Sequence, residues 1–146
     1  MGTFYTLIVY VHVVSAVVSV GPLVVLFPLI RKMRTASAGE ESMLLSLFKW
    51  TIRFVMHAGH VLVVTGVLLL IFGPWPWYTS WVIVTVGVMM LSIVFLASGF
   101  SKVLSRFPDE PENRDGLLRT LKETAWRYIL LLLVMLYLMV AKPSFW

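Results

Sequence analysis

The chain of 146 residues contains no cysteine, only three histidines and only 13% charged residues. The absence of cysteine excludes disulfides, iron–sulfur ligation, c-type haem attachment and thiolate zinc sites. The sequence also carries no glycine-rich phosphate loop and no catalytic-triad motif, so the usual signatures of nucleotide-binding and hydrolytic enzymes are missing. Any chemistry must therefore come from a small number of other polar residues.

Hydrophobic residues, in contrast, make up 60% of the chain, whereas soluble domains are roughly 45–50% apolar. A core of this length cannot hide the excess, so the composition predicts a single-domain integral membrane protein in contact with the lipid bilayer. Four apolar segments lie at roughly residues 4–30, 45–72, 81–100 and 117–141. Each is long enough to cross a hydrocarbon core of about 30 Å. Short links between them predict an all-α, antiparallel four-helix transmembrane bundle that comprises residues 1–146.

The distribution of charge predicts the orientation of this bundle. Of the twelve lysine and arginine residues, only Lys142 lies outside the two charged links and the segment ends beside them. The positive-inside rule then places both charged links in the cytoplasm and both termini outside, in a bacterial inner membrane. The uncharged link GPWPWYTS (residues 73–80) forms the outer aromatic belt. The net charge of +5 is explained in this way, without nucleic acid as a partner.

The three histidines, His12, His57 and His60, all lie inside the apolar segments. An imidazole in hydrocarbon is costly without a partner, and intramembrane histidines usually mark a site. Helical spacing places Arg53, His57 and His60 on one face of the second segment, within about 60° of arc. The first segment carries a polar face of its own, made of Tyr5, His12, Ser15 and Ser19. Because the two segments are antiparallel neighbours, the two polar faces are expected to meet, although Gly21–Pro22 should kink or loosen the first helix.

This arrangement predicts a haem b site. Two imidazoles from facing helices at similar depth are what a six-coordinate haem requires, so His12 and His60 are the candidate metal ligands. His57 is an alternate ligand or a supporting residue. Arg53, and Arg127 in the fourth segment, are candidates for binding the haem propionates through paired hydrogen bonds. The alternatives are that Arg53 extends to lipid headgroups and that Arg127 pairs with Glu123, four residues earlier.

A second interpretation is a copper site. The spacing of His57 and His60 also suits a small metal ion bound by one helix, and methionine sulfur is a ligand that Cu(I) prefers. The methionines inside the segments otherwise serve as packing residues; they are Met56, Met89, Met90, Met135 and Met139. Copper or other metal-ion translocation is therefore an alternative function. A non-catalytic subunit of a larger membrane complex is another, and a homodimer is also left open.

The sequence also resembles a superfamily of small four-helix bacterial membrane proteins. The resemblance lies in HVVSAVVSVGPL followed by IRKMR, in VLVVTGVLLL, and in LLRTLKETAWRYILLLLVMLYLMVAKP. It covers nearly the whole chain. The superfamily includes the membrane domain of copper-resistance-D-type proteins and, more distantly, the HemJ-type protoporphyrinogen oxidases. The HemJ-type resemblance implies haem b bound by a first-helix histidine, a role that falls on His12, and the copper-resistance-D resemblance implies copper uptake. Together these points favour a haem-binding membrane protein with a redox, electron-transfer or haem-handling role, and a haem-dependent oxidoreductase as its enzymatic form.

Overall fold

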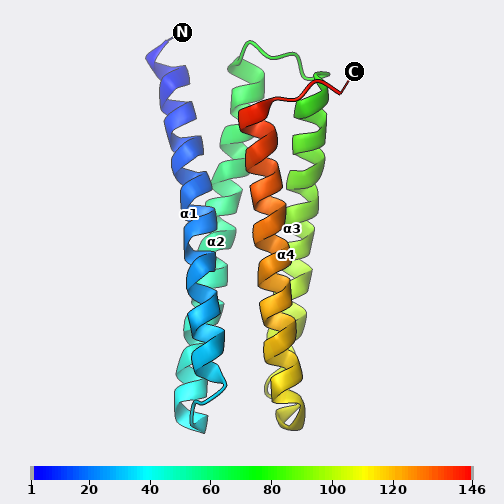
Figure 1. The fold of residues 1–146 in the computed structure, drawn as a ribbon. Helices are drawn as coiled ribbons and strands as arrows, with labels where there is room; N and C mark the ends of the chain where they lie inside the picture. The colour runs from blue at the N-terminus through cyan, green and yellow to red at the C-terminus, as the bar shows by residue number, and fades with distance from the viewer. Residues whose placement is uncertain (1, 146) are drawn as a thin grey trace.

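The computed structural model describes residues 2–145, and four long helices account for most of this range (Figure 1). The helices are α1 (Thr3–Met33), α2 (Ala38–Phe72), α3 (Ser80–Arg106) and α4 (Arg114–Ala141), and the 3-10 turn η1 (Pro111–Asn113) precedes α4. The described residues contain no strand. All four helices are long and apolar enough to cross a membrane. The predicted class, an all-α four-helix bundle in a multi-pass membrane protein, is confirmed.

The helices alternate in direction and form two helical hairpins side by side (Figure 1). α1 packs most extensively on α2, and α3 packs on α4, whereas α2 and α3 share the smallest helix–helix contact. The start of α1, the end of α4 and the link at residues 73–79 lie at one end (Figure 1), which we call the aromatic end. The links at residues 34–37 and 107–113 lie at the other, which we call the charged end. Which end faces the cytoplasm stays a prediction.

The helices are longer at the charged end than hydropathy predicts. α2 begins at Ala38 rather than at residue 45, and α3 ends at Arg106 rather than near residue 100. The early start of α2 is explained by its cap, because the backbone N–H and the hydroxyl of Ser37 both donate to the Glu40 carboxylate at 2.9 Å. This reciprocal capping of a helix start needs no apolar residues. Hydropathy therefore identified the apolar part of each helix and not its full extent. α1, in turn, runs as one helix through both Pro22 and Pro28.

The most tightly packed part of the core lies in the half of the bundle nearer the charged end. Its largest fully buried side chains include Met33, Phe48, Phe100 and Leu118. The rings of Phe48 and Phe100 are 6.1 Å apart and join α2 to α3. Burial of large apolar side chains in close contact fixes this half of the bundle. The half nearer the aromatic end contains a cavity of about 380 Å³.

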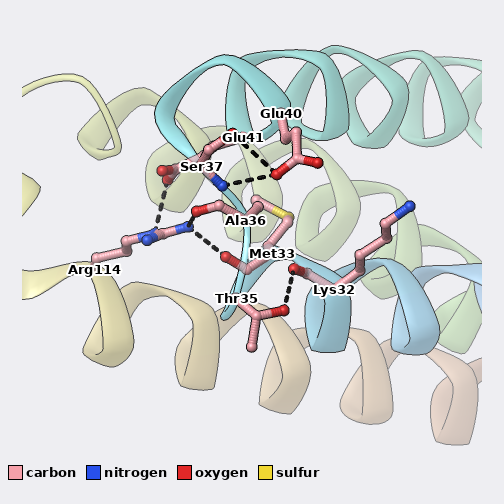
Figure 2. Close-up of polar contacts among 8 residues, drawn as sticks. All are labelled: Lys32, Met33, Thr35, Ala36, Ser37, Glu40, Glu41 and Arg114. Atoms are coloured by element: carbon pink, nitrogen blue, oxygen red, sulfur yellow. Dashed lines mark hydrogen bonds and ion pairs between the residues drawn. The ribbon is translucent and has the colours of Figure 1, made fainter.

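Arg114, the first residue of α4, joins the two hairpins at the charged end (Figure 2). Its guanidinium donates to the carbonyl of Met33 and, at 3.4 Å, to that of Ala36, both at the link between α1 and α2. Its Nε atom also lies 3.1 Å from a carboxylate oxygen of Glu41 in α2. A guanidinium can serve several acceptors at once because it carries five donors in a rigid plane. The Arg114 side chain, which belongs to the α3–α4 hairpin, therefore binds both the α1–α2 link and helix α2 of the other hairpin.

Candidate histidine site

His12 is the buried histidine of the three, with 9% of its surface exposed. Its Nδ1 atom lies 2.9 Å from the hydroxyl oxygen of Thr65 in α2. The Thr65 hydroxyl also lies 2.7 Å from the Val61 carbonyl and 3.1 Å from that of Leu62. Because a hydroxyl has one proton, donation to one of these carbonyls makes Thr65 the acceptor of the His12 bond. In that arrangement the imidazole proton lies on Nδ1 and Nε2 keeps its lone pair.

Gly66, next to Thr65, allows the two helices to meet closely at this point. A Cβ atom at position 66 would lie 3.3 Å from Cε1 of His12. Such a contact is tighter than ordinary van der Waals separation, so a larger residue would displace the imidazole. Thr65 and Gly66, both on α2, therefore fix the position of one edge of the His12 imidazole.

His12 also borders a cavity with a volume of about 380 Å³. Cavities that bind small molecules have volumes of roughly 300–1,000 Å³. All four helices contribute to its walls, which are mainly apolar and include Val9, Leu69, Val82 and Met139. Residues at the aromatic end also line it; they are Tyr5, Trp75, Trp81 and Lys142. The cavity therefore extends from a buried imidazole to the aromatic end of the bundle.

The polar face expected on the first segment does point inward. Ser15 and Ser19 are buried like His12, and Tyr5 lines the cavity. Ser15 donates to the carbonyl of Val11 at 2.7 Å, and Ser19 donates to that of Ser15 at 2.8 Å. Hydroxyls bonded to their own helix are satisfied without a second helix, and their small size permits close packing. His12 is thus the group on this face that reaches across to α2.

The polar face expected on the second segment points the other way. Arg53, His57 and His60 are all exposed, and none of them lines the His12 cavity. The rings of His57 and His60 lie side by side, with centroids 6.2 Å apart. The structure therefore groups these residues as predicted but does not bring His60 to His12. The reason is helical phase: Thr65, which meets His12, lies five residues beyond His60, or about 140° around the helix.

The depth of the two histidines differs as well. His12 is level with Thr65, and His60 lies five residues, or about 7.5 Å, closer to the charged end. Counting from the aromatic ends of the helices anticipates this difference, because eight residues separate Phe4 from His12 and eight separate Phe72 from Val64. The same count places His12 opposite Val64, which is next to Thr65 and Gly66, the two residues that the sequence analysis missed.

Arg127 is exposed on α4, and its Nη2 atom lies 3.9 Å from a carboxylate oxygen of Glu123. The ion pair considered as the alternative for Arg127 is therefore present. Neither Arg127 nor Arg53 borders the His12 cavity. Among residues 2–145, no three histidine, aspartate or glutamate side chains come close enough to hold one metal ion. A metal at His12 would need other ligands or a prosthetic group.

A second, smaller cavity of about 100 Å³ lies next to His60. Three methionines contribute to its walls: Met56, Met89 and Met135. Met89 also lines the His12 cavity, so one thioether side chain borders both spaces. Met90, in contrast, is exposed on the outside of α3.

Comparisons of the chain with protein-family models, with curated proteins and with solved structures found no match.

Proposed function

We propose that this multi-pass protein lies in a bacterial inner membrane and binds haem b in the His12 cavity, with a redox, electron-transfer or haem-handling role. The observation that supports the proposal is the state of His12. Its imidazole is buried, is oriented through Nδ1 by Thr65 and borders an apolar cavity. A metal-ligating histidine almost always donates its other ring N–H to a nearby acceptor, and Thr65 is such an acceptor.

The residues around the cavity fit a haem group in their chemistry. His12 would hold the iron through Nε2, and Thr65 would keep the ring in place. The apolar walls would surround the macrocycle and exclude water. Met89 and Met139 bring thioether side chains to the same cavity, and methionine joins histidine as a haem ligand in some proteins. When bound, the haem would supply one-electron redox chemistry. Pairing His12 with His60 on one haem would require α2 to turn, so the geometry favours His12 as the first ligand.

The visible spectrum tests this proposal. Protein purified in detergent from haem-replete cells, or incubated with hemin, should show a Soret band that shifts on reduction with dithionite. His12→Ala should abolish the band. His57→Ala and His60→Ala serve as controls because neither side chain lines the His12 cavity, and both variants should keep the band. A colourless preparation that hemin does not change would refute haem binding, and loss of the band in His60→Ala would instead support the His12–His60 pair.

Copper(I) binding is the second candidate function, and the cavity beside His60 is the observation that favours it. Thioether and imidazole groups are suitable Cu(I) ligands, and this cavity has both. We expect Met89→Leu to lower the copper content of protein loaded with Cu(I) under reducing conditions. Met90→Leu is the matched control, since the neighbouring Met90 is exposed. Equal copper content in the wild type and both variants, measured by elemental analysis, would exclude this site.

A further inference from the structure

Lys142 lies at the mouth of the His12 cavity. Of the twelve lysine and arginine residues, it is the one that the charge pattern places at the aromatic end. All seven acidic side chains lie between residues 40 and 123, on the parts of the helices and links nearer the charged end. No salt bridge joins Lys142 to an acidic side chain within the described residues. The cavity therefore has a cation at its opening and no carboxylate of an aspartate or glutamate beside it.

Two tryptophans hold the Lys142 ammonium at this position. Its Nζ atom lies 4.4 Å from the ring centroid of Trp75 and 5.9 Å from that of Trp81. Both rings also line the cavity. A cation over the face of an indole is attracted to it but keeps its hydrogen-bond donors available. The ammonium can therefore bind an anion while it stays on the rings.

The backbone around Lys142 is also fixed. Lys142 ends α4 in the left-handed conformation, with φ 45° and ψ 52°, and its N–H donates to the Leu138 carbonyl. Glycine is the usual residue at such a helix end, so a lysine there is uncommon. The next residues are held by Ser80, whose hydroxyl donates to the Pro143 carbonyl at 3.4 Å and accepts from the Phe145 N–H at 3.0 Å. Ser80 thus positions the segment that carries Lys142.

We propose that Lys142 is the anion-recognition group of the His12 cavity and that the cavity takes an amphipathic ligand with an apolar body and a carboxylate head at the aromatic end. His12 is level with Thr65, seven residues before the end of α2 at Phe72, so such a ligand extends about 10 Å along the bundle. The identification of this ligand as haem rests on the proposed function, and the carboxylates are then the haem propionates. This assigns to Lys142 the role that the sequence analysis gave to Arg53 and Arg127.

Porphyrins with free and esterified carboxylates test the inference. Hemin and metal-free protoporphyrin IX would each be compared with their dimethyl esters, by Soret titration and by quenching of tryptophan fluorescence in detergent. We expect the wild type to bind the free acids about tenfold more tightly than the esters, as one charge-assisted hydrogen bond implies. Lys142→Gln should lose this preference, and Lys142→Arg should retain it. Lys122→Gln is the control, because Lys122 is exposed near the charged end of the same helix.

A wild type without the preference, or a Lys142→Gln variant that keeps it in full, would overturn the inference. Metal-free protoporphyrin separates this outcome from failure of the proposed function, because its binding needs no iron ligand. If the carboxylate preference depends on Lys142 but hemin binding is unchanged in His12→Ala, haem ligation by His12 is wrong and the role of Lys142 stands. If hemin binding depends on His12 but free acids and esters bind equally well, haem ligation by His12 stands and the role of Lys142 is wrong. Absence of binding by every porphyrin refutes both.

Discussion

The Nδ1 atom of His12 and the hydroxyl of Thr65 form a 2.9 Å hydrogen bond between α1 and α2, and this bond determines which ring nitrogen keeps a lone pair. Thr65→Val preserves the shape of the side chain but leaves the buried His12 N–H without its acceptor. We expect the dissociation constant for hemin to rise about 10- to 100-fold, as for other residues that orient a metal ligand. Thr65→Ser, which keeps the hydroxyl, should bind hemin like the wild type in the same Soret titration. Equal affinity of all three proteins would show that Thr65 does not orient the ligand.

Gly59 and Gly66 lie two turns apart on α2 and offer a matched pair of substitutions. A Cβ atom at Gly59 meets nothing within 4 Å, whereas one at Gly66 lies 3.3 Å from the His12 ring. Gly59→Ala should raise the free energy of unfolding by about 0.5–1 kcal/mol, because alanine loses less conformational entropy than glycine when the helix forms. Gly66→Ala should lose that gain and weaken hemin binding. Thermal unfolding in detergent and a hemin titration measure the two effects, and identical behaviour of the variants would contradict the close packing at Gly66.

The contacts of Arg114 predict that it stabilises the bundle more than the other arginines at the charged end. Arg114→Ala removes bonds to two carbonyls and the ion pair with Glu41, so we expect a loss of about 1–3 kcal/mol in the free energy of unfolding. Arg114→Lys should recover little of this free energy, because an ammonium group cannot reproduce the planar arrangement of donors in a guanidinium.

Arg119 provides the control for Arg114. It pairs with Glu123 at 3.2 Å, but its side chain is 78% exposed. Exposed pairs of this kind contribute about 0–1 kcal/mol, so Arg119→Ala should leave the melting temperature nearly unchanged. Similar losses for Arg114→Ala and Arg119→Ala would argue against the joining role of Arg114.

Ser80 predicts how firmly the segment after α4 is held. Ser80→Ala removes both hydrogen bonds to Pro143 and Phe145. Hydrogen exchange in the C-terminal peptide should accelerate, and the preference for free over esterified porphyrin carboxylates should decrease. Ser98→Ala is the matched control, since Ser98 is on the same helix and bonds only to the Val94 carbonyl of that helix. Unchanged exchange in Ser80→Ala would mean that other contacts hold the segment.

The sequence predicts the number of membrane crossings well, because each crossing needs a long apolar run and the chain has four. It predicts the helix ends less well, because they depend on local capping: the bonds from Ser37 to Glu40 extend α2 into polar sequence. Helical phase correctly placed Arg53, His57 and His60 together. Phase gives only the relative direction of side chains on one helix, however, and not which face meets a neighbour.

Packing between helices decides which face of α2 meets a neighbouring helix. Thr65 and Gly66 are small, and α2 turns them toward α1, which leaves the larger polar residues outside. A threonine and a glycine in an apolar run carry little signal by themselves, and they become informative only when their depth is matched to that of His12. The cavity and the position of Lys142 at its mouth depend on all four helices and on the segment after α4, so no local pattern predicts them.

The position of Arg114 has a mechanical consequence for the opposite end of the molecule. Arg114 fastens the hairpins together at the charged end, and α4 continues from there for 28 residues, or about 42 Å. A tilt of one hairpin by about 5° around that point therefore moves its far end by about 4 Å. This displacement is comparable to the roughly 3.5–4.0 Å separation of stacked carbon atoms. A small change of tilt at the charged end is thus enough to change the separation of the hairpins at the aromatic end by about the thickness of a flat ring.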